Sequence, residues 1–495
     1  RLSFSHGALK NQTDGFRINN HQDHEIFNAY MQASITPGLN LQAEYTYRDT
    51  NNGDLEQNFD PNDFNALLNR DYDENTVRLG ARLTPNLATT VLLSLIYSDR
   101  EEVEDEGLNV NTLPCFILPP TWPFPCVGTF TTTDQQVFTG DRETLQGEGQ
   151  YIYQADRLNV TAGALYADNN NSGALVSTAT TSFPLPPSIV TVDLGNNTDI
   201  GGLYAYGNLS MRDDMEWTIG LSYTDYEIDF DDQVIADEDF DRFNPKLGLR
   251  WNLTGALDLR AAWFRSVMPL LANKRLLEPT QVAGFSQFYD EASGTRADTY
   301  AVGLDLRVSE RLHLGGESMR RELETPSTFF DSVNNLGFVV FEDRDEWRHS
   351  LYAYWLPHDH WSLSAEAVYD EFESADSIVN VNLPTKAETW SVPLKVSYFH
   401  PSGFFGLLGV TYVDQEIERQ ALASEATGDD DFVVTDLAVG YRLSKRRGIL
   451  SVAVQNLFDE DFNYQDDSYR TFEDEPTTGP YIPDRTVMLR MTLNF

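Results

Sequence analysis

The chain has 495 residues, enough for roughly two or three soluble domains or for one large barrel. Acidic residues outnumber basic ones, 77 against 35, and the formal charge of -42 argues against nucleic acid as a partner. The 29 Phe, 23 Tyr and 8 Trp residues argue against a disordered acidic chain. No apolar run of about 18 residues exists, so we expect no membrane-spanning helix.

The chain begins at Arg1 and shows no signal peptide. We therefore expect that a targeting segment has been removed or that a longer chain continues upstream.

Alternation of apolar and polar residues starts near the N-terminus. Between Leu39 and Tyr47 every second residue is apolar, and the residues between them are polar. A period of two is typical of a β-strand with one apolar face and one wet face. The same pattern recurs at 158–166, 217–223, 243–251, 257–263, 300–308, 361–369, 437–443 and 486–495. The pattern predicts an all-β fold.

The connections between these segments are alternately short and long. The nine short ones are rich in Gly, Pro, Asn and Asp and lie at 36–38, 84–86, 155–157, 213–214, 253–255, 309–310, 357–359, 401–403 and 445–448. The long ones are acidic or rich in Pro, Asn and Gly and include 51–72, 101–143, 168–197, 269–297 and 461–482. Short periplasmic turns and long extracellular loops are typical of outer-membrane barrels.

We therefore predict a transmembrane, antiparallel up-and-down β-barrel of about 20 strands (18–22) in the bacterial outer membrane. Residues 1–495 are expected to form one barrel domain, and the last strand is expected to close the ring by pairing with the first. The alternative, a soluble β-sandwich, rarely runs about twenty alternating strands in one domain.

The only two cysteines, Cys115 and Cys126, lie in one long segment with four prolines between them. An isolated close pair in an exported protein predicts a disulfide that pins the loop. Two unpaired thiols are the alternative, and two cysteines alone do not make a zinc site.

The wet faces of the predicted strands are expected to line the lumen. Their charged residues are either a binding or selectivity lining or ordinary solvation with inter-strand pairing. The candidates are Glu44, Arg48, Arg250, Arg260, Asp305, Arg307, Glu366, Arg442 and Arg490.

No motif predicts catalysis or a bound cofactor. The acidic loops lack the spacing of a calcium loop, so we interpret them as a solvated surface facing lipopolysaccharide. Gly-x-Ser-x-Gly, His-Glu-x-x-His and Gly-rich phosphate-binding motifs are all missing. We expect neither an enzyme nor a metal site.

The C-terminal end carries a family resemblance. Residues 456–462 read Asn-Leu-Phe-Asp-Glu-Asp-Phe, residues 483–485 read Pro-Asp-Arg, and an amphipathic segment then ends at Phe495. This arrangement resembles the C-terminal end of TonB-dependent outer-membrane receptors. The resemblance implies that Phe495 is an assembly signal recognised by the barrel-assembly machinery, and that outer-membrane lipid surrounds the protein.

The resemblance also implies transport or binding of a solute across the outer membrane. Family members carry an N-terminal plug and a TonB-contacting box before the barrel, whereas the first wall strand here is expected at about Leu2. A plug upstream, loops that fold inward, or a periplasmic or surface protein partner could fill the lumen. The alternative function is an export conduit or scaffold for a polysaccharide or surface assembly, associated with a periplasmic repeat domain.

Overall fold

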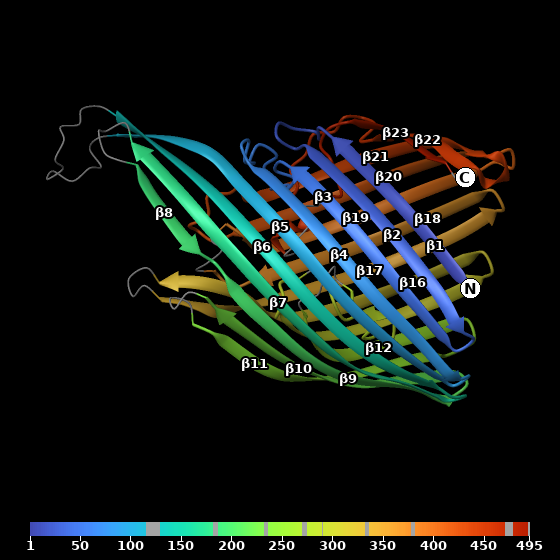
Figure 1. Cartoon of the computed structure of the whole chain (residues 1–495). Coiled ribbons are helices and arrows are strands. Elements are labelled where there is room, and N and C mark those ends of the chain that lie inside the picture. Colours follow the sequence, from blue (N-terminus) through green and yellow to red (C-terminus); the bar gives the residue numbers. More distant parts are fainter. Residues whose placement is uncertain are drawn as a thin grey trace.

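The structure, a computed structural model, describes residues 1–114, 129–181, 187–231, 236–269, 275–289, 291–331, 336–377, 382–470 and 479–493. One antiparallel sheet of 21 strands dominates these residues and is rolled into a barrel (Figure 1). No helix in the described ranges is both long and apolar enough to cross a membrane.

All strands of this sheet except β8 form the barrel wall. The first half of the wall consists of β1 (Leu2–Thr13), β2 (Gln22–Thr36), β3 (Leu39–Asn52), β4 (Asn69–Asn86), β5 (Thr89–Pro114), β6 (Thr129–Gln154), β7 (Leu158–Thr181), β9 (Asn196–Arg212), β10 (Met215–Phe230) and β11 (Glu238–Asn252). The second half consists of β12 (Leu257–Val267), β15 (Arg296–Ser309), β16 (Leu312–Asp331), β17 (Leu336–His358), β18 (Trp361–Ser374), β19 (Pro384–Phe399), β20 (Phe404–Arg419), β21 (Gly428–Leu443), β22 (Gly448–Gln455) and β23 (Thr486–Leu493). The other elements are β8 (Ser188–Asp193), β13 (Gln281–Val282), β14 (Phe285–Ser286) and the short helices η3 (Ser444–Arg446) and η4 (Asp467–Tyr469).

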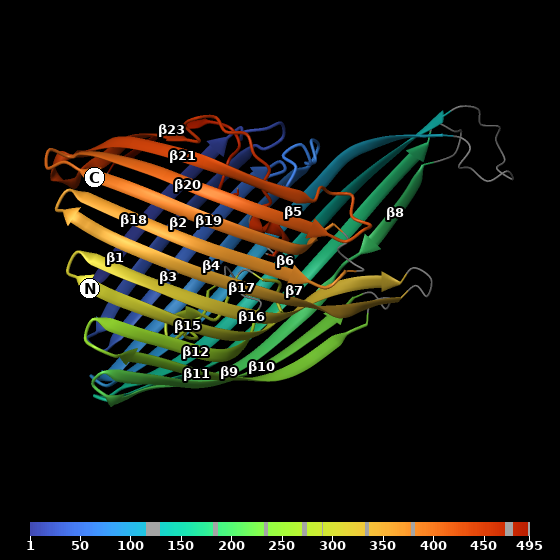
Figure 2. The same ribbon diagram turned by 180° about the vertical axis from the view of Figure 1, so that it is seen from behind.

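Each wall strand pairs with the next wall strand in the chain, so the all-β, up-and-down prediction is confirmed. All nine short turns are present at one end of the barrel, although the turn expected at 84–86 lies between Asn86 and Thr89. β1 begins and β23 ends at this turn end, where Leu2 pairs with Ala33 and Leu493 pairs with Gly448 (Figure 2).

The period-two pattern places opposite chemistry on the two faces of the wall. On β5, Leu93 is 55% exposed on the outer face, whereas the inward-facing Ile96 and Ser98 are buried. Val302 and Leu304 of β15 are likewise exposed on the outer face. An exposed apolar belt around a ring of strands is the surface that hydrocarbon chains of a membrane cover.

Two long segments predicted as loops are largely strands. A strand crosses a membrane in about 9–11 residues, whereas β5 and β6 have 26 residues each and β7 has 24. These strands continue past the barrel rim into 101–143 and 168–197. The β-branched residues on both sides, such as Val137 and Val176, keep the ladder going far beyond the wall.

The predicted seam between the first and last strands is not among the ladders of the described residues. β1 and β23 are both edge strands here, with Phe4 and Leu489 strongly exposed. Cys115, Cys126 and Phe495 lie outside the described residues, so their roles stay predictions.

Candidate functional site

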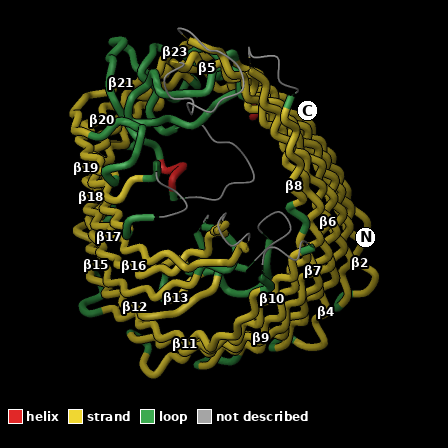
Figure 3. The backbone as a smooth tube through the Cα atoms, turned by 90° about the vertical axis from the view of Figure 1, so that its left-hand side faces the viewer, coloured by secondary structure: helices red, strands yellow, loops and turns green. Residues whose placement is uncertain are grey.

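Apolar residues on the inner face of the wall mark the places where loops fold into the lumen. Residues 275–289, here called the inner segment, belong to the connection between β12 and β15. They pack inside the barrel (Figure 3). Val282 and Phe285 of this segment form a buried cluster with Phe264 of β12 and Ala301 of β15. The long connection predicted at 269–297 is present, and its residues 275–289 fold into the lumen, which is one of the three expected ways of filling it. Burial of the Val and Phe side chains against the wall favours the folded-in position.

Hydrogen bonds from three wall strands hold the inner segment in place. Glu148 of β6 accepts a hydrogen bond from the Leu277 N–H at 2.6 Å, and Gln146 donates to the Arg275 carbonyl at 2.7 Å. Tyr206 of β9 donates to Glu278, and Glu44 of β3 pairs with Arg275 at 2.9 Å. These bonds satisfy polar groups that would otherwise be buried without partners.

The connection between β22 and β23 is a second inward loop. Its Phe462 stacks on the inward-facing Phe432 of β21, with ring centroids 3.9 Å apart. Tyr469 of η4 packs edge-on against Phe372 of β18. Both belong to a buried cluster that also contains Phe59 of the β3–β4 connection. Two loops far apart in sequence therefore meet inside the barrel, where η4 is visible as a short helix within the ring (Figure 3).

A cavity of about 210 Å³ remains between the wall and these inward loops. Arg321 lies over the Tyr289 ring at 3.9 Å and pairs with Glu291 and with Glu346, the latter at 2.9 Å. The complete lining is Tyr289, Glu291, Met319, Arg321, Glu346, Trp347, Arg348, Asp370, Asp467 and Arg470. We call this cavity the lumen pocket.

Two charged groups of the lumen pocket stay accessible. Arg348 is 54% exposed and lies 3.6 Å from Asp370, whose other partner is Arg470. The Asp467 side chain is also exposed, at 3.7 Å from Arg470. The pocket thus presents one accessible guanidinium and one accessible carboxylate above a set of neutralised buried pairs.

The predicted lining residues fall into two groups. Glu44, Arg250, Arg260 and Asp305 lie around the inner segment. Arg260 pairs with Asp305 at 2.8 Å and lies over the Phe285 ring at 4.9 Å. A Cβ added at Gly284 would lie 3.0 Å from Arg250 Nη2, so the turn of the inner segment sits on this cation.

The other predicted residues are spread along the wall. Arg48 pairs with Glu74 at 3.5 Å, and Glu366 accepts a hydrogen bond from Tyr354 at 2.8 Å. Arg442 lies over the Phe399 ring at 4.8 Å near the turn end. Arg307 and Arg490 are exposed, each on the face of its strand opposite the exposed apolar row. Their part in a transport path stays a prediction.

The residues of the lumen pocket escaped the sequence analysis. Asp370 directly follows the predicted segment 361–369, whereas Arg321 and Arg348 lie on β16 and β17, where no alternation was identified. The convergence of all three depends on loops folding inward. Local signals were nevertheless present, because Ala262 and Phe264 break the alternation by placing apolar side chains on the wet face. Such breaks mark the positions where an inward segment covers the wall.

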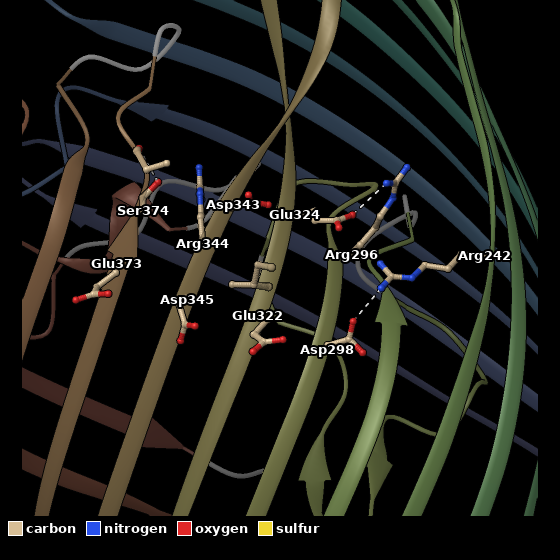
Figure 4. A pocket seen from close by; sticks show the side chains of 12 residues that line it. Arg242, Arg296, Asp298, Glu322, Glu324, Asp343, Arg344, Asp345, Glu373 and Ser374 are labelled. Carbon is tan, nitrogen blue, oxygen red and sulfur yellow. Dashed lines mark hydrogen bonds and ion pairs between the residues drawn. The ribbon is translucent and has the colours of Figure 1, made fainter.

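A second cavity, of about 520 Å³, lies at the loop end between β11 and β15–β18 (Figure 4). Arg242 and Arg296 point into the same space, where they pair with Asp298 at 3.0 Å and Glu324 at 3.1 Å. Arg296 is also held between the rings of Phe240 and Phe341. These guanidinium groups support the hairpins of the rim.

Comparison with known proteins identifies the fold. A family model described as TonB dependent receptor-like, beta-barrel matches residues 4–316. No curated protein sequence matches the chain. The ferric-catecholate import receptor Fiu of E. coli K12 is 13% identical with a TM-score of 0.66, covering 100% of this chain and 78% of that one. The copper transporter OprC is 12% identical with a TM-score of 0.68, covering 100% and 76%. The ferripyoverdine receptor of the outer membrane of Pseudomonas aeruginosa is 13% identical with a TM-score of 0.67, covering 99% and 67%.

The two lines of sequence evidence for the family come from different parts of the chain. The resemblance was carried by residues 456–495, whereas the family model matches residues 4–316. The family consists of transport receptors, which confirms the expected class of function, transport or binding of a solute. The protein is a bacterial outer-membrane protein, and the chain belongs to the TonB-dependent receptor-like β-barrel family.

Proposed function

We propose that this protein takes up a small zwitterionic solute across the outer membrane and binds it first in the lumen pocket. The observation that carries the proposal is the pair of accessible opposite charges, Arg348 and Asp467, in a lumen narrowed by folded-in loops. Arg348 has guanidinium donors to spare for an anionic group, and Asp467 offers a carboxylate to a cationic one.

The charge of the whole chain supports a solute with a cationic group. A formal charge of -42 produces an attractive field for cations around the extracellular loops. A purely anionic solute would be repelled before it reached Arg348. A zwitterion experiences little net repulsion and finds partners for both of its charges.

Partners and organisation complete the proposal. Residues 1–495 form one barrel domain, and outer-membrane lipid covers the apolar belt. Plug and TonB contacts follow from the family, while lipopolysaccharide and the barrel-assembly machinery remain predicted partners. Loops inside the lumen favour gated uptake over the alternative of an open export conduit.

A binding experiment tests the proposal with a dipeptide, its C-terminal amide and its N-acetyl form as probes. We expect calorimetry on the purified barrel to give affinity for the dipeptide and about tenfold weaker binding of either blocked form, because each loses one ion pair. Arg348→Gln should weaken the dipeptide to the level of its amide. Arg157→Gln, at an exposed position in the turn between β6 and β7, is the matched control and should leave affinity unchanged. Equal affinity for all three probes would rule out the zwitterion proposal.

A further inference from the structure

The strands that extend past the rim build a second, smaller sheet outside the barrel. β5, β6 and β7 project well beyond the other strands, and β8 runs alongside them (Figures 1 and 2). Residues Ser188–Asp193 of β8 pair with 174–179 of β7, at the place where β9 no longer accompanies β7. The projecting sheet lies on the loop side of the barrel, away from the apolar belt.

β8 is a free edge of this sheet. Within the described ranges it has a ladder with β7 alone, and all six of its residues are exposed. Ile189 is 66% exposed and Val190 is 53% exposed. Every second residue of an edge strand directs its N–H and C=O groups away from the sheet, where they are available to another strand.

Between its two ends the edge lacks the features that normally prevent such pairing, since Pro187 precedes the strand and Asp193 is its last residue. Natural proteins protect edge strands with charged side chains, Pro or a β-bulge. Residues 188–192 read Ser-Ile-Val-Thr-Val, and their register with β7 is uninterrupted. Three of the five are Ile or Val, residue types that favour strand pairing. An unprotected edge on a projecting sheet fits the addition of a strand from another chain.

The negative charge around β8 indicates what kind of partner segment would bind there. Residues 101–114, 129–143, 168–181 and 188–193 contain ten acidic residues and one basic residue, Arg142. Asp134 lies on β6, which is separated from β8 only by β7. It accepts a hydrogen bond from Ser177 of β7, the residue opposite Val190. A second copy of this chain would bring an equally acidic sheet against the first one. A basic segment gains attraction instead.

We propose that the free edge of β8 binds an extended, positively charged segment of a partner protein, which pairs as an added β-strand. Backbone hydrogen bonds along 188–193 provide the pairing. Apolar side chains of the segment cover Ile189 and Val190, and its Lys or Arg side chains reach the surrounding carboxylates. This inference is independent of the lumen pocket.

The test uses the full chain in lipid nanodiscs and a fluorescein-labelled peptide of alternating Lys and Val. The control peptide has the same sequence with N-methylated peptide nitrogens, which keep the charge but cannot complete a ladder. We expect fluorescence anisotropy to show binding of the first peptide at least about tenfold tighter than the control. Equal binding of both peptides would mean adsorption to the acidic surface and would overturn the proposal, as would no binding.

A pair of matched variants locates the site. Ile189→Lys with Val190→Lys adds two positive charges to the free edge and should weaken peptide binding by about tenfold or more. Leu108→Lys with Val110→Lys adds the same charge to exposed positions of β5 and should change binding less than about twofold. Equal losses in the two variants would overturn the proposal. A dimer seen in sedimentation and lost only in the β8 variant would overturn it in favour of a second copy.

Discussion

At the scale of single residues, Asp466 shows how one buried carboxylate joins two inward loops. Its Oδ2 accepts the Gln57 N–H at 2.9 Å and its Oδ1 accepts the Ser468 N–H at 3.0 Å. Burial raises the pKa of Asp466 to about 6, because these bonds replace the lost water only in part. At neutral pH the protein therefore holds a buried charge that weakens the contact between its loops.

Lower pH is expected to stabilise the contact between loops 53–68 and 456–470. The folded pKa of about 6 exceeds the unfolded value of about 4, so the contribution of protonated Asp466 is full below pH 4 and is lost as the pH rises through 6. The full stabilisation of the loop contact by protonation of Asp466 is on the order of 3 kcal/mol. Hydrogen exchange of the amides in both loops, corrected for intrinsic rates, measures this stabilisation between pH 4 and 7. Asp466→Asn should remove the dependence, and Asp461→Asn, at an exposed position, should keep it. Protection that does not vary with pH in the unmodified chain would contradict this.

At the scale of elements, the inner segment is a small hairpin pressed against the wall. Ala283 and Gly284, between β13 and β14, both have positive φ, at 51° and 95°. Two such residues form the tight turn that reverses a two-stranded hairpin. The turn brings Val282 and Phe285 to the same side, where both are buried. The inner segment therefore obstructs the lumen of the barrel to which it belongs.

Phe285→Ala is expected to release the inner segment from the wall. Loss of a buried Phe costs about 3–5 kcal/mol, which is comparable to the whole docking energy of a short segment. Single-channel conductance in planar bilayers should rise relative to the unmodified protein. Leu422→Ala, at an exposed loop position, is the control and should leave conductance unchanged. If Phe285→Ala conducts no better than the control, the inner segment does not limit the channel.

A second feature at this scale is a row of carboxylates on the outer face, just above the apolar belt. The row begins beside Lys10 and crosses five neighbouring strands through directly paired residues: Glu25, Asp49, Asp73, Glu101 and Asp141. Like charges directly opposite each other destabilise a sheet. Electrostatic repulsion within the row therefore destabilises the sheet, and its size depends on the salt concentration.

Asp49→Asn is expected to stabilise the barrel by about 0.5 kcal/mol at low ionic strength, because it removes one charge from the middle of the row. The gain should shrink as added NaCl screens the remaining pairs. Thermal unfolding in detergent at two salt concentrations measures both effects. Asp14→Asn removes an exposed carboxylate outside the row and serves as control. A stabilisation equal to that of Asp14→Asn would assign the effect to net charge alone.

At the scale of the whole molecule, loops of the chain occupy part of the space inside the wall. Barrels of 16–18 strands leave an open channel, so a wall of about 20 strands needs a filling. Three buried apolar clusters between loops and wall provide part of it.

We accordingly expect the unmodified chain to carry only small currents in a planar bilayer, since ions must pass the inner segment and the loops around η4. Steady currents of the size seen in open porins would show that the loops do not close the lumen. The Phe285→Ala variant serves as the conducting reference in the same measurement.

The wall was predictable because its signal is local. Apolar and polar residues must alternate along a strand that lies between lipid and a wet lumen, so the strand at 39–47 could be identified directly. Each turn must contain residues that allow a tight reversal of the chain, so the turn at 401–403 could be identified in the same way. The length of β5 and β6 could not, since polar residues such as Glu101 and Glu104 fit an exposed strand as well as a loop. The prediction of nine turns held while the prediction of loops at 101–143 failed for this reason.

The barrel, its approximate strand number and the polarity of its two faces can be read from the amino-acid sequence, because each depends on residues two positions or one turn apart. Which loops enter the lumen, and which side chains meet there, depends on contacts made only in the folded barrel. Arg321 and Glu291 come together because Phe285 and Tyr469 bury their rings inside the ring of strands. That burial depends on surfaces contributed by residues hundreds of positions apart, and no local pattern records it.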